Sequence, residues 1–242
     1  MDKDIQKGFY FDEKNHRYYM DGKQMTGVTT VLGVLAKPAL IQWAANQAIQ
    51  YVKDNAQDVV YSVEKFPIGI TVFNEILERA RTAHAQKRDK AADIGTLAHA
   101  EVEKYIKTGE WEPTKDEQIN DMVQKFVDWA KENKVKFLNS EKVVHSKVHW
   151  FGGKYDFTCE LNGLTYLGDF KTGSGIYFEM FLQCAAYQLA LQEQEPDTKI
   201  DGHIIVNSTK DGKFNTKTHY DYESTKQGFL AALTLYKLLN TN

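Results

Sequence analysis

The chain contains little cysteine and no long apolar run. The two cysteines, Cys159 and Cys184, fall in an expected strand and an expected helix. A disulfide framework, a four-thiolate metal site and an iron–sulfur cluster are therefore not expected. No apolar run approaches the roughly 20 residues that cross a bilayer, and residues 1–19 lack the apolar core of a signal peptide. We expect a cytoplasmic protein without membrane contact.

An excess of basic residues is also absent, because the net charge is −3 over 242 residues. If the substrate is a nucleic acid, a local basic face and bound cations must attract it. One such face is formed by basic residues on the later part of an expected helix: Arg79, Arg81, Lys87, Arg88 and Lys90. Two interpretations stay open, a solvated helix surface and a surface that contacts phosphates.

The N-terminal part of the chain reads as a hairpin followed by helices. Residues 9–23 alternate in polarity and contain the turn-forming pair Asp21-Gly22. Pro38 stands at the favoured first-turn position of a helix. We expect a second helix over residues 71–88 and a separate one that begins at residues 93–96.

The C-terminal part alternates strands and helices. A capping box at residues 114–117 predicts the start of an amphipathic helix. The segments that follow read as a strand at 135–148, a hairpin at 151–172, a helix at 176–193, strands at 202–208 and 214–220, and a helix at 222–239. This order predicts an α/β fold around a mixed sheet.

The hairpin at residues 151–172 carries the functional interpretation. Its Asn162-Gly163 pair is the strongest short hairpin signal, and a turn there places Asp156 directly opposite Asp169. Two carboxylates opposed across a ladder repel each other. A divalent cation between them would reverse that effect, so we predict a metal site.

Lys171 follows Asp169 by two residues and is expected on the same face of its strand. Hydrolysis of a phosphodiester needs charge neutralisation, an activated water and a stabilised leaving oxygen. Hard cations bound by carboxylates can supply all three, and a neighbouring lysine can orient or deprotonate the water. Gly152 and Gly153 leave room for a bulky ligand or a close backbone approach.

The pattern of these residues resembles the PD-(D/E)XK nuclease superfamily, and within it the RecB-like exonuclease branch that includes phage-type single-chain exonucleases. Four segments carry the resemblance: GTLAHAEVE with His99, GGKYDF with Asp156, LGDFKT with Asp169 and Lys171, and QCAAY with Gln183 and Tyr187. Without the other motifs, His99 would read as a satisfied core or surface histidine. Gln183 and Tyr187 would then read as the polar edge of a helix.

The resemblance implies a fold and a domain organisation. The fold would be a restriction-endonuclease-like core, with a central mixed β-sheet flanked by helices and an N-terminal helical extension. We expect residues 1–242 to form a single nuclease domain. Within it, residues 1–92 would form the N-terminal hairpin and helical extension, and residues 93–242 the PD-(D/E)XK core.

The resemblance also implies roles for single residues. One or two Mg²⁺ or Mn²⁺ ions would be bound by His99, Asp156, Asp169 and the backbone carbonyl of Phe170, with Glu141 as a further candidate. Lys171 would position the attacking water. Gln183 and Tyr187 would contact the DNA strand or orient the lysine. The cysteine quartet that holds an iron–sulfur cluster in some relatives is missing.

The function implied is a metal-dependent DNA exonuclease of phage-type recombination, replication or repair. It would act on single- or double-stranded DNA, with a recombination, annealing or helicase protein as a candidate partner. The basic residues 79–90 would steer the strand, and Trp150 or Phe151 would stack on a base. The alternatives are a site-specific endonuclease on the same fold, a catalytically decayed nucleic-acid-binding protein, and a structural module with unrelated ion pairs.

Overall fold

The computed structural model describes residues 8–65 and 69–240. Residues 1–7, part of the stretch without a signal-peptide core, therefore lie outside the described residues. The chain divides into two compact units, one of Met1–Leu35 with Leu97–Asn242 and one of Ala36–Thr96. Among the described helices, none combines the length and the apolar character that crossing a membrane requires.

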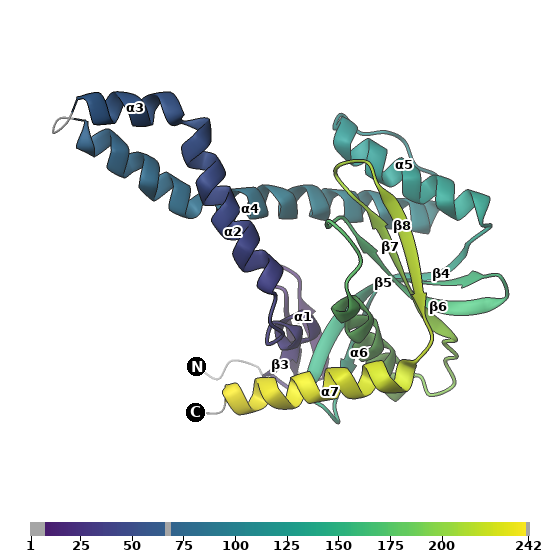
Figure 1. Ribbon diagram of the computed structural model, residues 1–242. Helices are drawn as coiled ribbons and strands as arrows, with labels where there is room; N and C mark the ends of the chain where they lie inside the picture. The colour runs from purple at the N-terminus through teal and green to yellow at the C-terminus, as the bar shows by residue number, and fades with distance from the viewer. Residues whose placement is uncertain (1–7, 66–68, 241–242) are drawn as a thin grey trace, which may run out of the picture. The chain divides into compact units, whose positions relative to one another are not determined.

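The larger unit is built on one mixed sheet (Figure 1). Within the described residues it has eight strands in the order β1-β2-β3-β5-β6-β7-β8, and β4 pairs with β5. The β3–β5 and β6–β7 pairs are parallel and the others antiparallel. The strands are β1 (Phe9–Asp12), β2 (Arg17–Met20), β3 (Lys23–Gly27), β4 (Lys136–Ser146), β5 (Phe151–Leu161), β6 (Leu164–Lys171), β7 (Gly202–Ser208) and β8 (Phe214–His219).

The β5–β6 hairpin has the predicted turn and register. Asn162 and Gly163 both have positive φ, 52° and 78°, the backbone that a two-residue hairpin turn needs. Leu161 pairs with Leu164, and the ladder continues to Phe157 and Gly168. Asp156 and Asp169 come directly after that last pair, so both acids lie where the two strands part.

Helices cover both faces of the sheet. Phe170 packs against Phe126 of α5 (Glu117–Glu132), while its neighbour Asp169 contacts Gln183 of α6 (Phe178–Gln194). Because consecutive strand residues point to opposite faces, α5 and α6 lie on opposite sides of the sheet. The helix α7 (Tyr222–Leu239) and the short α1 (Val28–Leu32) join α6 in one apolar cluster. The expected α/β class, with a mixed central sheet flanked by helices, is confirmed and is consistent with a restriction-endonuclease-like fold.

The N-terminal strands differ from the expected single hairpin. Asp21 and Gly22 do form a turn with positive φ, 49° and 71°, but it joins β2 to β3. A second turn over residues 13–16 joins β1 to β2. His16 takes the left-handed conformation there, which the residue types did not signal. The prediction of one hairpin over residues 9–23 is therefore wrong in extent.

Two predicted helix starts are also wrong. Residues 70–108 form the single helix α4 (Ile70–Thr108), so no helix begins at residues 93–96. One glycine inside a helix costs about 1 kcal/mol relative to alanine, and Gly95 has helix-forming alanines around it. The α5 helix is capped by Asp116, whose side chain accepts from the amides of Gln118 and Ile119. The expected capping box at residues 114–117 therefore began two residues too early.

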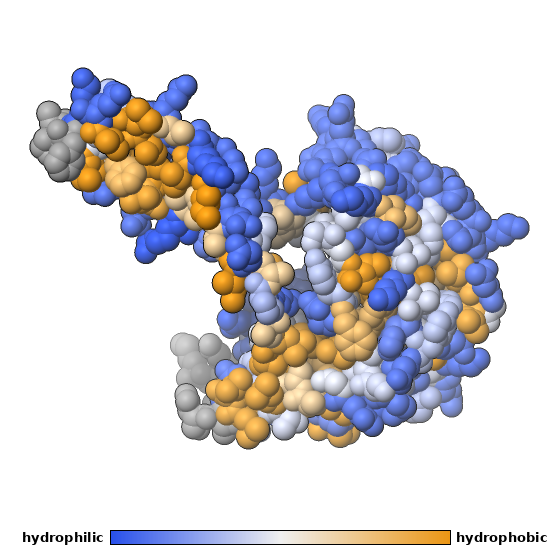
Figure 2. Space-filling model, viewed as in Figure 1, coloured by the Kyte–Doolittle hydropathy of each residue, from blue (hydrophilic) through white to orange (hydrophobic). Residues whose placement is uncertain are grey.

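The smaller unit consists of α2 (Pro38–Asp54), α3 (Ala56–Glu64) and the part of α4 up to Thr96. Pro38 is at the first position of its helix, as predicted. Few side chains of this unit are fully buried, and apolar ones gather on its surface around α3 (Figure 2). The large apolar side chains of this unit that are exposed are Leu40, Ile41, Ile49, Val60, Tyr61, Val63, Ile70, Val72 and Leu77.

Candidate metal centre

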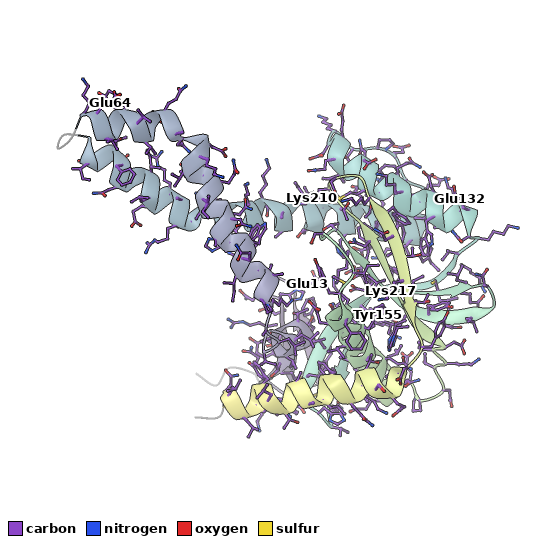
Figure 3. The ribbon with its side chains drawn as sticks, viewed as in Figure 1. Glu13, Glu64, Glu132, Tyr155, Lys210 and Lys217 are labelled. Atoms are coloured by element: carbon purple, nitrogen blue, oxygen red, sulfur yellow. The ribbon has the colours of Figure 1, made fainter. Side chains whose placement is uncertain are left out.

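The side chain of Asp156 lies where the β5–β6 ladder ends. Its Oδ2 accepts a hydrogen bond of 2.7 Å from the backbone N–H of Phe170. The same oxygen is 3.3 Å from Nδ1 of His99. His99 lies on the part of α4 that belongs to the larger unit. The ring of His99 meets that of Phe170 edge-on, with centroids 5.2 Å apart. The preceding residue, Tyr155 (Figure 3), is fully buried in the cluster beneath α6 and anchors the strand.

Glu141 completes a group of three donors. It stands on β4 between the residues paired with Phe157 and Tyr155, and therefore opposite Asp156. One ligand atom from each of His99, Glu141 and Asp156 lies within 4.8 Å of the others. Glu141 has a φ of 51°, the left-handed region that non-glycine residues rarely adopt. Strain of this kind persists where the surrounding structure fixes it, and it clusters at functional sites.

The donor set fits a divalent cation. The two carboxylates are the ligand type that Mg²⁺ and Mn²⁺ prefer, and the imidazole is a nitrogen ligand of the kind that transition-metal ions accept. Without a metal ion, the carboxylates of Glu141 and Asp156 would repel each other at this separation, and the ion pair of Glu141 with Lys154 offsets only part of that repulsion. The residues present can therefore hold such an ion.

The second acid of the hairpin has different partners. Asp169 is 1% exposed, and its Oδ2 forms an ion pair of 2.5 Å with Nζ of Lys171. Its Oδ1 accepts from Nε2 of Gln183 at 3.3 Å, and the same Nε2 donates to the hydroxyl of Tyr187 at 2.8 Å. The Gln-x-x-x-Tyr pair of α6 is thus brought to the second acid rather than left at the surface.

The two glycines of β5 make room for aromatic rings. A Cβ on Gly153 would lie 2.3 Å from Cε1 of Tyr187, and one on Gly152 would lie 2.6 Å from Cγ of Tyr18. The expectation of space for a bulky ligand or a close backbone approach is therefore wrong. The absent side chain at Gly153 instead leaves space for the ring of Tyr187.

Burial controls the protonation of the two acids. It raises the pKa of Asp156 to about 6, against the opposing attraction of Lys171. Burial likewise raises the pKa of Asp169 to about 6, again against the attraction of Lys171 and with repulsion from Asp156 added. Both groups are ionised above that pH, at a cost that a bound cation would offset.

The pKa values of His99 and Lys171 are shifted in opposite directions. Burial, helped by the charge of Lys171, lowers the pKa of His99 to about 4, so its ring is neutral near pH 7. Burial also acts to lower the pKa of Lys171, but Asp169 and Asp156 outweigh it and the pKa is raised. Lys171 is therefore an ammonium in this state and donates to Asp169.

The basic helix has acidic neighbours. Arg79 pairs with Glu75 at 3.8 Å, Arg81 with Glu78 at 3.0 Å and Arg88 with Asp89 at 2.9 Å, while Lys87 donates to the side chain of Gln47 at 2.6 Å. These contacts match a solvated helix surface. Residues 79–90 all belong to the smaller unit.

The aromatic candidates differ in accessibility. Phe151 is fully buried, so the expectation that it stacks on a base is wrong. Trp150 has a φ of 63° and donates from its indole N–H to the carbonyl of Gln24 at 3.1 Å. One edge of the Trp150 ring is thus fixed to β3, and its stacking on a base stays a prediction.

One charged residue beside the site was missed from the sequence. Lys154, two residues before Asp156 on β5, forms an ion pair with Glu141. Its spacing from Asp156 could have drawn attention to it, since residues two apart on a strand share a face. The contact with Glu141 depends on the β4 register, which no turn motif fixed.

Comparison with known proteins leaves the site as the main support for a function. No family model matches the chain, and no curated protein matches it. The crystal structure of SSO0001 is 9% identical, with a TM-score of 0.32 over 89% of this chain and 83% of that one. An alkaline exonuclease, LHK-Exo from Laribacter hongkongensis, is 14% identical, with a TM-score of 0.30 over 62% of this chain and 88% of that one. At TM-scores this low, neither likeness carries a functional conclusion.

Proposed function

We propose that this chain is a divalent-cation-dependent DNA nuclease. The observation that carries the proposal is the clustering of His99, Glu141 and Asp156 within 4.8 Å, next to the ion pair of the buried Asp169 with the partly exposed Lys171. Such clusters of perturbed groups are typical of catalytic sites.

The cation would be Mg²⁺ or Mn²⁺, one or two ions, held by His99, Glu141 and Asp156. Asp169 and the carbonyl of Phe170 would be further ligands. A bound ion of this kind neutralises phosphate charge and lowers the pKa of a bound water. The low pKa of His99 keeps its ring neutral and able to ligate near pH 7.

The chain's own residues would position the reacting groups. Lys171, as an ammonium, offers the hydrogens not taken up by Asp169 to the attacking water or to a phosphate oxygen. Gln183 fixes Asp169 from the helix side, and Tyr187 fixes Gln183. Holding the groups in place in this way lowers the entropy cost of reaching the transition state.

DNA is the proposed substrate, and removal of nucleotides from an end is the proposed mode. The basic residues between 79 and 90 would steer the strand, and Trp150 would stack on a base. Within one nuclease domain, residues 1–92 would be the extension that receives the strand and residues 93–242 the catalytic core. A recombination, annealing or helicase protein would be the natural partner of such an enzyme inside a cell.

A comparison of linear and closed circular DNA tests this proposal and its rivals. With Mg²⁺ or Mn²⁺, an exonuclease shortens the linear molecule and leaves the circle intact. A site-specific endonuclease would cut the circle. A decayed, binding-only protein would retard both molecules in a gel without cutting either. EDTA is the control, and cleavage that survives it would contradict cation dependence.

A further inference from the structure

Lys154 is the cation that contacts Glu141 in this structure. Its Nζ forms an ion pair with Oε2 of Glu141, diagonally across the β4–β5 ladder. The side chain of Glu141 is 14% exposed, whereas that of Lys154 is 32% exposed. Lys154 therefore approaches the acid from the solvent side, on a flexible stem that can swing outward.

Each of the three carboxylates of the site has its own partner. Lys154 pairs with Glu141, Lys171 pairs with Asp169, and Asp156 is held by a neutral histidine and a backbone N–H. With the three carboxylates ionised and both lysines protonated, the charge of these groups is −1. A divalent cation brings it to +1, which a single phosphodiester then neutralises.

A divalent ion bound to Glu141 and the ammonium of Lys154 would compete for the same carboxylate. Two positive charges a few ångströms apart repel strongly in a partly buried site. Lys171 is less able to leave, because Asp169 is almost fully buried and the lysine is held between two acids. Lys154 is the lysine that can move.

We infer that Lys154 is a displaceable counter-cation of Glu141, which leaves this carboxylate when a divalent cation binds and then contacts a backbone phosphate of the bound strand. This inference rests on the proposed function. Lys154 thereby couples metal binding to substrate binding, because the phosphate contact becomes available only once the metal is present.

Amine labelling of the unaltered chain tests the displacement. With an amine-reactive reagent and mass spectrometry, the reactivity of Lys154 rises when Ca²⁺ or Mn²⁺ is added. Lys142 is the internal control, since it lies on β4, pairs with Glu195 at 2.5 Å and has the same side-chain exposure of 32%. Its reactivity stays constant. An unchanged or lower reactivity of Lys154 with the cation would overturn the displacement.

The variant Lys154→Met separates the two parts of the inference, with Lys142→Met as its matched control. Calorimetric titration with Mn²⁺ in the absence of DNA gives a several-fold tighter Kd for Lys154→Met, because the competing ammonium is gone. In Ca²⁺, without turnover, its affinity for DNA falls about tenfold and the salt dependence loses about one charge. Lys142→Met changes neither quantity, and Lys154→Arg restores DNA binding.

The outcomes distinguish this inference from the proposed function. If the wild type binds no Mn²⁺, the proposed metal site itself fails. If the wild type binds Mn²⁺ and Lys154→Met binds it equally or more weakly, Lys154 is a fixed structural partner and the inference is overturned. Tighter Mn²⁺ binding with unchanged DNA affinity would overturn the phosphate contact.

Discussion

The backbone N–H of Phe170 donates to the carboxylate of Asp156 at 2.7 Å, in the position where the next rung of the β5–β6 ladder would otherwise form. This bond ties the first acid of the site to the strand that carries the second. The position of the Asp156 carboxylate is thus tied to the backbone of β6.

The variant Asp156→Asn tests whether the site sacrifices stability for cation binding. An amide oxygen can still accept from the Phe170 N–H, while the buried charge is removed. Because burial raises the pKa of Asp156 from 3.8 to about 6, its ionised form destabilises the fold by at most about 3 kcal/mol. In EDTA at pH 8, we expect a Tm equal to or a few degrees above that of the wild type.

The same melting experiment with Mn²⁺ supplies the contrast. The cation raises the Tm of the wild type and leaves that of Asp156→Asn unchanged, since only the wild type binds it tightly. A variant that is clearly less stable than the wild type in EDTA would show that Asp156 is a structural residue.

Lys171→Ala separates catalysis from metal binding. The lysine lies against Asp169 and is not one of the three clustered donors. We expect cleavage to fall about 100-fold or more, the usual contribution of a positioned proton donor or acceptor, with Mn²⁺ binding retained. Lys213→Ala is the control, because Lys213 pairs with Asp211 at 2.7 Å and is 71% exposed. Equal activity of Lys171→Ala and Lys213→Ala would exclude a catalytic role.

Gly153→Ala tests the packing that places Tyr187. The new methyl group would lie 2.3 Å from the ring of a tyrosine that is 3% exposed, so one of the two must move. Overpacking of this kind costs about 1–3 kcal/mol, and we expect cleavage to fall with it because Gln183 loses its partner. Gly173→Ala is the matched control, since a Cβ there meets no atom within 4 Å. Urea unfolding measures both variants, and similar stability for the two would contradict the assigned packing.

Acid sensitivity is predicted at a histidine outside the site. His203 is 1% exposed and contacts Gln188 at 2.8 Å, and burial lowers its pKa from 6.5 to about 4. The unfolded chain therefore takes up a proton that the folded chain does not, and stability is lost as pH falls from 6.5 towards 4. At pH 5 this loss is about 2 kcal/mol.

The variant His203→Gln should lose this part of the pH dependence. The quantity to compare is the difference in unfolding free energy between variant and wild type at pH 7.5 and at pH 5. That difference moves by about 2 kcal/mol in favour of the variant at pH 5. No movement would mean that His203 is protonated as readily in the folded chain as in the unfolded one.

Local signals in the sequence sufficed for the hairpin. Asn162-Gly163 fixes the turn type and the register as far as Phe157 and Gly168, and the two acids come directly after that pair without being paired in the ladder. The helix break expected near Gly95 failed because one glycine cannot interrupt a strongly helical segment. A single glycine ends a helix only where the residues around it also favour a break, and the residues around Gly95 favour a helix.

The remaining site geometry depends on contacts between distant segments. Glu141 meets Asp156, and Lys154 meets Glu141, through the β4–β5 register, which shifts at a bulge between Phe137 and Asn139. No residue type marks that shift in the sequence. The fit of Tyr187 over Gly153 likewise arises only when α6 packs on the sheet.

The most direct test of the central claim is release of label from end-labelled linear DNA by the wild type and by Asp169→Asn. The account predicts release by the wild type in Mg²⁺ or Mn²⁺, none in EDTA and none by Asp169→Asn. Equal release by wild type and variant, or release by the wild type that persists in EDTA, would contradict it.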